Sequence, residues 1–245
     1  RVTLDAQHIA RYAALCGFSA SQGVPLIYPQ MLTFPLVTAF MCSPECPWPA
    51  MGTVHLANSI EQRKQLRAGD TVRVEMGTGE LFTHDKGQGF TLHLRILRDG
   101  ELVWSATQSL LRVGVKETSG QPFASQLALD TSLSCQTEFS APADIGRSYG
   151  AVSGDRNPIH LAAVTAKLFG FKRSIAHGMW TKARALSYLL PATALEQTSA
   201  SVEFKTPLLL PGRAALWTER SAHGAQFEVR DKKGLRPHLR GQLSY

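Results

Sequence analysis

The two halves of this 245-residue sequence resemble each other, and this internal repeat limits the possible folds more than any single motif does. The stretch Tyr12-Ala-Ala-Leu-Cys-Gly17 matches Tyr149-Gly-Ala-Val-Ser-Gly154, and residues 31–40 parallel residues 179–188. The matched segments come in the same order in both halves. Repetition of this kind indicates that one structural unit occurs twice.

Each unit is predicted to contain a helix followed by strands. Met179, Ala183, Leu186 and Leu190 recur at the spacing of a buried helical face, and Pro191 ends that helix because proline cannot continue the hydrogen-bond ladder. Runs rich in β-forming residues and separated by glycine or proline predict strands at 71–77, 89–98, 101–113, 201–205, 213–220, 225–230 and 238–244.

A helix followed by an antiparallel sheet gives an α+β fold in which the sheet wraps its apolar face around the helix. Two such units in one chain can pair edge to edge, which removes two exposed edge strands. The sequence therefore predicts one continuous, pseudo-dimeric sheet. We expect a first unit at residues 1–116, a linker rich in Ser, Thr, Gln and Gly at 117–133, and a second unit at 134–245.

The formal net charge of +7 favours an anionic partner, such as nucleic acid, phospholipid, or a phosphate-bearing small molecule or carrier protein. The basic residues are scattered and lack interleaved aromatic residues, so nucleic acid is not expected.

The longest apolar run, residues 26–41, is interrupted by Pro29 and Pro35 and cannot cross a bilayer as one helix. No charged-then-apolar leader is seen, so we expect a cytoplasmic protein without a membrane partner.

The cysteines are expected to be reduced thiols, because four of them in a long chain without an export signal do not suggest a disulfide framework. Cys42 and Cys46 flank Pro44 without a second Cys or His pair nearby. We therefore expect no metal site.

Residues 149–160 form the stretch with the densest chemistry. Gly154 and Pro158 predict a loop, and reactive groups are often displayed on loops. Asp155 and His160 lie five residues apart in it, so both side chains can turn toward one point and hold one water molecule. A histidine beside a carboxylate suits proton transfer to or from that water. Taken alone, the pair could also be a loop-capping aspartate and a hydrogen-bonded structural histidine.

A second group of interest is His177-Gly178, at the predicted start of the central helix. Free backbone N–H groups and the helix dipole favour negative charge at such a position, so it can bind an oxyanion. Glycine also lets a carbonyl group approach the backbone closely.

Both stretches resemble one family. Gly154-Asp-x-Asn-Pro-x-His160, followed by Ile175-Ala-His-Gly-Met179, is similar to the signature of the MaoC-like (R)-specific enoyl-CoA hydratases and 3-hydroxyacyl-thioester dehydratases. The spacing from Asp155 to Gly178 also resembles that between the family's catalytic aspartate and its oxyanion-hole glycine. This resemblance implies a double hot-dog fold, with one helix-wrapped antiparallel sheet in each half.

The resemblance also assigns roles to individual residues. It implies that Asp155 and His160 hold the reacting water and that the Gly178 N–H stabilises the enolate of a thioester. Substrate contacts are expected from Asn157, His177 and Met179. Alternatively, Asn157 supports the loop, His177 positions the start of the helix, and Met179 belongs to the core.

The implied activity is that of a hydro-lyase of fatty acid metabolism. It is the reversible syn addition of water to trans-2-enoyl thioesters of coenzyme A or acyl carrier protein, which gives (R)-3-hydroxyacyl thioesters. The thioester carrier is part of the substrate, and no other cofactor is expected. A homodimer is a further expectation.

The first half resembles the inactive N-terminal hot dog of two-domain members of the family. The repeat sets Phe18, Ala20 and Gly23 opposite the Asp, Asn and His of the motif, which leaves no acid or base there. The first half also lacks a loop after Gly17 that the second half keeps, and we expect this to open room for an acyl chain. One departure from many relatives is Ala162, where an acidic residue is common.

Two other functions remain open. A hot-dog thioesterase would hydrolyse the thioester, and a catalytically idle protein would only bind it. Ser153 and Ser187 lack the context of a nucleophile elbow, which disfavours Ser-His-Asp hydrolysis.

Overall fold

The structure is a computed structural model that describes residues 1–48, 50–125, 127 and 132–245. The strands are β1 (Val2–Thr3), β2 (Thr53–Gln62), β3 (Thr71–His84), β4 (Gly87–Arg98), β5 (Glu101–Val113), β6 (Gln121–Pro122), β7 (Ser134–Ala141), β8 (Thr198–Phe204), β9 (Gly212–Ser221), β10 (Gly224–Asp231) and β11 (Pro237–Ser244). The helices are α1 (Ala6–Cys16), α2 (Pro29–Met41), α3 (Ile145–Ser153), α4 (Pro158–Leu161), α5 (Ala163–Leu168) and α6 (Gly178–Leu189), with a short 3-10 helix at Ala20–Gln22.

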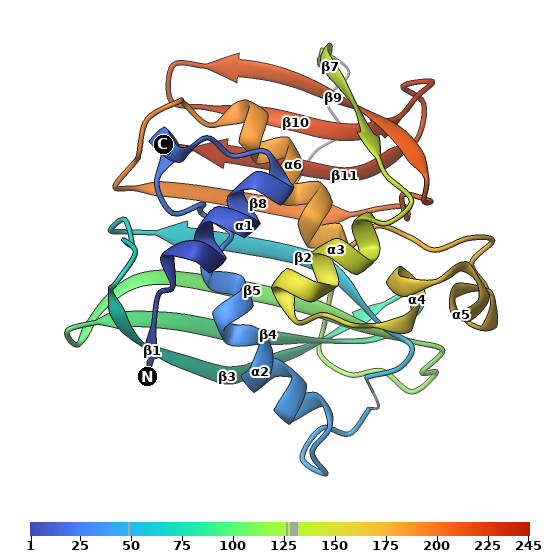
Figure 1. Ribbon diagram of the computed structural model, residues 1–245. Helices are drawn as coiled ribbons and strands as arrows, with labels where there is room; N and C mark the ends of the chain where they lie inside the picture. The colour runs from blue at the N-terminus through green and yellow to red at the C-terminus, as the bar shows by residue number, and fades with distance from the viewer. Residues whose placement is uncertain (49, 126, 128–131) are drawn as a thin grey trace.

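The strands form a single sheet in the order β1-β3-β4-β5-β2-β8-β11-β10-β9-β7 (Figure 1). β6 lies off this path and pairs with β3. Each half of this order mirrors the other, so that β2 and β8 meet antiparallel at the centre. The prediction of an α+β fold with one continuous pseudo-dimeric sheet is confirmed.

All the strands predicted from the sequence are present, but four strands were missed: the short β1 and β6, and the longer β2 and β7. The order of elements also needs correction. β1 and β7 precede the helices of their halves, so the expectation of helices first was wrong. β3 also continues past residue 77 to His84, with an irregular register between Thr78 and Leu81 near two glycines.

The helices lie on one face of the sheet (Figure 1). α2 contacts β3 and β4, whereas α6 contacts β10 and β11, so each half of the sheet has its own central helix.

The first pair of matched stretches, residues 12–17 and 149–154, lies at the ends of α1 and α3, which contact each other. Both helices end in a left-handed glycine with φ of 82°, Gly17 and Gly154. Their buried tyrosines, Tyr12 and Tyr149, have ring centroids 6.1 Å apart.

The seam between the halves contains a fully buried lysine. Lys182 on α6 donates hydrogen bonds to the Asn58 backbone oxygen (3.1 Å) and Asn58 Oδ1 (2.6 Å) on β2, and to the Ala200 carbonyl (3.0 Å) on β8. Burial lowers the pKa of Lys182 well below its ordinary value. The three N–H donors of an ammonium match these three acceptors, so one side chain ties the central helix of the second half to both central strands.

The boundaries predicted for the two units stay a prediction. Part of the proposed linker is described: β6 pairs with β3, and Ser125 Oγ donates to the buried Glu203 carboxylate at 2.7 and 2.9 Å. Linker residues 126 and 128–131 lie outside the described residues.

All four cysteines are free thiols, as expected. Among the described helices, none meets the length and hydropathy that a transmembrane span requires.

We predict that Lys182→Ala lowers the free energy of unfolding by about 3–5 kcal/mol, because it removes the shared donor at the seam and leaves a cavity. Lys182→Met keeps most of the volume and is expected to cost about 1–3 kcal/mol, since Asn58 still loses its partner. Urea denaturation followed by circular dichroism measures both. Lys64→Ala, which removes an exposed ion pair with Glu101, is the control and should change stability by less than about 1 kcal/mol. An unchanged Lys182→Ala midpoint would contradict the assignment.

Candidate active site

The segment from Gly154 to His160 is held by short local hydrogen bonds. After Gly154 ends α3, Ser153 Oγ accepts from the Asp155 N–H (3.2 Å), and Asp155 Oδ1 accepts from the Asn157 N–H (3.1 Å). Asn157 Oδ1 accepts from the N–H of Ile159 and so caps α4. The predicted loop is therefore shorter than expected, because a proline at the first helical position favours a helix and His160 lies on α4.

His160 is a buried imidazole with a defined tautomer. Its side chain is enclosed, with the residue 8% exposed, and Nδ1 donates to the Ile175 carbonyl at 2.8 Å. Because a carbonyl only accepts, Nδ1 carries the proton and Nε2 keeps its lone pair when the ring is neutral. Burial lowers the pKa of His160 below 6.5, while the Asp155 charge and the hydrogen bond to Ile175 act in the opposite direction. His160 is thus a neutral base at neutral pH.

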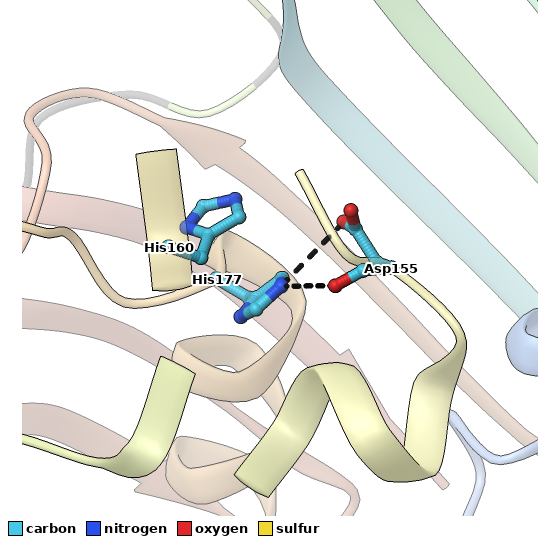
Figure 2. A group of neighbouring side chains, drawn as sticks. All are labelled: Asp155, His160 and His177. Carbon is cyan, nitrogen blue, oxygen red and sulfur yellow. Dashed lines mark hydrogen bonds and ion pairs between the residues drawn. The ribbon is translucent and has the colours of Figure 1, made fainter. Parts of the chain in front are cut away.

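Asp155 and His160 come together as the sequence predicted. One side-chain ligand atom each from Asp155, His160 and His177 lies within 4.8 Å of the other two (Figure 2). A water molecule that makes two ordinary hydrogen bonds of about 2.8 Å spans such a separation. The Asp155 side chain is 33% exposed, so solvent reaches the carboxylate.

His177 contacts both Asp155 and His160. Its Nε2 donates to the Asp155 backbone carbonyl at 3.0 Å and lies 3.8 Å from Asp155 Oδ2 (Figure 2). Its ring stacks on His160 with centroids 3.7 Å apart, and the Tyr149 ring lies 4.9 Å away. Burial, and then the charge of His160, lower the pKa of His177 well below its ordinary value. These contacts position the pair, and the expected contact between His177 and substrate stays a prediction.

Gly178 is the first residue of α6, and the start of this helix has no hydrogen bond from a capping side chain. Its backbone N–H is therefore available to an oxyanion. A Cβ atom at Gly178 would lie 2.8 Å from Cε1 of Phe204, so the packing of this ring against the backbone requires glycine. Met179 is partly buried and packs against the core, which agrees with the alternative prediction that it is a core residue.

A contact from the first half also supports this segment, and no pattern in the sequence predicted it. His8 on α1 donates from Nε2 to the Val152 carbonyl at 2.8 Å, and its Nδ1 pairs with the Tyr28 hydroxyl at 2.9 Å. Val152 lies near the end of α3, just ahead of Asp155. Residues of both halves therefore hold in position the segment that contains Asp155.

Asp155, His160 and His177 are the residues that could hold a metal ion. Two of the four imidazole nitrogens already donate to backbone carbonyls, which leaves few ligand positions. The expectation that no metal takes part stays a prediction.

The comparisons with known proteins agree with the motif. A family model described as MaoC like domain matches residues 116–236, which include the whole segment from Asp155 to Gly178. The 3-hydroxyacyl-thioester dehydratase X of Mycobacterium tuberculosis is 33% identical over 237 residues, covering 96% of this chain and 84% of that protein. The chain belongs to the MaoC-like dehydratase family.

Solved structures of this family share the fold. A crystal structure of HtdX from Mycobacterium tuberculosis matches with a TM-score of 0.83 and 29% identity, covering 99% of this chain and 96% of that one. A MaoC-like dehydratase from Phytophthora capsici matches with a TM-score of 0.82, covering 100% of this chain and 93% of that one, and at 18% identity it supports the fold alone. The prediction that this chain has a double hot-dog fold and is a hydro-lyase is confirmed.

The lowered pKa of His160 predicts how activity depends on pH. The neutral ring is the base, so activity is lost as pH falls through the pKa of the folded protein, which lies below 6.5. We expect kcat/KM to stay constant from about pH 8 to about pH 6.5 and to fall at lower pH. Measurement in buffers of constant ionic strength tests this, with circular dichroism at each pH as the control for folding. An acid limb that begins above pH 7 would contradict it.

Proposed function

We propose that this protein reversibly hydrates trans-2-enoyl thioesters to (R)-3-hydroxyacyl thioesters. The observation that carries the proposal is the approach of the Asp155 carboxylate to His160, whose Nε2 is left free by the bond from Nδ1 to Ile175. The name of the Mycobacterium tuberculosis relative, a 3-hydroxyacyl-thioester dehydratase, supports the same substrate class.

In the hydration direction, Asp155 and His160 hold one water molecule beside C3 of the enoyl group. The pair removes a proton from this water as its oxygen bonds to C3. The electron pair of the double bond moves onto the thioester carbonyl, and the resulting enolate oxygen accepts a hydrogen bond from the Gly178 N–H. C2 then receives a proton from the pair, which returns to its starting state. Dehydration follows the same steps in reverse.

The stereochemistry follows from this arrangement. Oxygen and hydrogen are both delivered by groups on one side of the double bond, so the addition is syn. The face of the substrate that meets the pair sets the (R) configuration at C3.

The substrate carrier is proposed to be coenzyme A or acyl carrier protein, both of which bear phosphate. The net charge of +7 favours such a partner. Lys167, Lys172 and Arg173 are exposed and lie in the segment between His160 and His177, where they can attract phosphate near the site. A homodimer and a cytoplasmic location remain predictions, and light scattering tests the first.

We predict that Asp155→Asn and His160→Ala each lower kcat for hydration of an enoyl-CoA by about a hundredfold or more, because each removes one of the groups that move the proton. Loss of the conjugated enoyl absorbance measures the rate, over a panel of chain lengths. Arg156→Ala, which changes the neighbouring residue, is the matched control and should retain activity. Full activity in either site variant would refute the assignment.

The same assay separates the other functions. A thioesterase would release free thiol, which a thiol reagent detects, whereas a hydratase consumes the absorbance without releasing thiol. An idle binding protein would give neither signal. Activity that survives treatment with a chelator would support the absence of a metal, and activity lost on chelation and restored by a cation would contradict it.

A further inference from the structure

The outer side of α5 carries apolar side chains that are open to solvent. Val164 and Leu168 lie four residues apart on this helix and are 74% and 78% exposed, and Phe169, which follows the helix, is also exposed. Residues four apart lie on the same side of a helix, so the two aliphatic side chains are neighbours. Exposed apolar side chains that gather in one place are typical of a surface that binds a partner.

The opposite side of α5 fixes this helix beside the candidate active site. Thr165 Oγ1 donates to the carbonyl of Pro158 at 2.6 Å, and Ala166 is fully buried. Pro158 begins α4, the helix that carries His160, and α4 and α5 contact each other. Figure 1 shows α5 beside α4 at the edge of the molecule. The exposed side of α5 therefore lies on the outer surface near the catalytic pair.

The segment that contains α5 is strongly basic. Residues 156–195 include six Lys or Arg and no Asp or Glu, whereas the whole chain has 26 basic and 19 acidic residues. Four of the six are exposed, namely Arg156, Lys167, Lys172 and Arg173. Lys167 lies three residues after Val164 and one before Leu168, so a positive charge accompanies the apolar side chains. A surface of this kind attracts an acidic partner.

The combination of apolar and basic side chains favours a protein over a small phosphate-bearing molecule. Cations alone can hold the phosphates of coenzyme A. They do not account for three exposed apolar side chains in one short segment, whereas a protein interface has an apolar centre and a charged rim. A carrier protein that delivers its acyl group to Asp155 and His160 has to come to rest on the surface near α4.

We infer that the α5 surface, defined as the exposed side chains of residues 164–173, docks an acidic carrier protein that bears the acyl thioester. This inference rests on the proposed function and makes a carrier protein, rather than free coenzyme A, the preferred carrier of the acyl group. The apolar side chains supply contact area, and the cations orient the acidic partner. The acyl group on its flexible phosphopantetheine arm then reaches Asp155 and His160 while the carrier stays outside.

Binding of an acyl carrier protein loaded with a butyryl group tests the inference without turnover. Fluorescence anisotropy compares the wild type with Val164→Ser/Leu168→Ser, which makes two exposed side chains polar. Substitutions at such exposed positions have little effect on folding. The affinity for the carrier protein should fall about tenfold or more, because apolar contact is lost. The affinity for butyryl-CoA should change less than about twofold.

Charge reversal tests the contribution of the cations. Lys167→Glu/Lys172→Glu should weaken carrier binding about tenfold at low salt and reduce its dependence on salt. The control is Lys64→Glu/Arg67→Glu, which changes the net charge equally. These two residues follow the end of β2 that pairs with the start of β8, whereas the segment after α5 donates to the carbonyl of Leu208, beyond the end of β8. The control should bind the carrier as the wild type does.

Hydration rates show whether the effect belongs to docking. The same crotonyl group is attached to the carrier protein and to pantetheine, which lacks a carrier. Val164→Ser/Leu168→Ser should lower kcat/KM for the carrier-protein thioester about tenfold and change that for the pantetheine thioester less than about twofold.

Four results would overturn the inference. No carrier binding by the wild type, or unchanged binding in both variants, would show that the α5 surface does not dock the carrier. Equal weakening of butyryl-CoA would assign the surface to the shared phosphate-bearing arm. An equal loss with crotonyl-pantetheine would show that α5 only positions α4. Conversion of a dimer to a monomer in light scattering, with carrier binding retained, would assign the surface to a second copy of this chain.

Failure of the proposed function gives a different result. Wild-type protein would then leave the enoyl absorbance of every crotonyl thioester unchanged, whatever its affinity for the carrier protein.

Discussion

The structure depends on one buried lysine at the seam between its halves. A strongly polar group removed from water is tolerated only when its hydrogen bonds are satisfied, and Lys182 meets this condition with acceptors on both β2 and β8. Asn58 Nδ2 in turn donates to Gln30 Oε1 on α2 at 3.3 Å. The chain of bonds joins the central helix of each half through the central strands. Apolar packing alone is less directional, so this network helps to fix the register of one half against the other.

That register matters because the candidate site is assembled across the seam. In the second half, the segment between α3 and α4 supplies Asp155, α4 supplies His160 and α6 supplies Gly178. From the first half, His8 holds the backbone at Val152. The degenerate half has lost the acid and base of the motif, yet it still fixes the position of the loop that retains them. A duplicated fold can thus keep one site and use the second copy as its support.

Features that depend on a short, continuous sequence pattern could be predicted. Features that depend on contacts between residues far apart in the sequence could not. β2 was missed because Asn58 and Gln62 are polar at buried positions, which hides the alternation of a strand. Gln62 bonds to the carbonyl of Leu195, a residue of the other half. Asp155 and His160 were predictable because their motif is short and continuous. The contact from His8 to Val152 could not be predicted, since the repeat compares the halves position by position and does not reveal contacts between them.

Burial of the stacked imidazoles keeps the base of the site neutral, and hydrogen bonds hold it in place. Burial lowers the pKa of both rings, whose centroids are 3.7 Å apart, and the charge of His160 lowers the pKa of His177 further. His177 must keep its proton on Nε2 to reach the Asp155 carbonyl, and His160 must keep its proton on Nδ1 to reach Ile175. Both tautomers are therefore set by backbone oxygens. The free Nε2 of His160 and the carboxylate of Asp155 are left as the groups that can share one water.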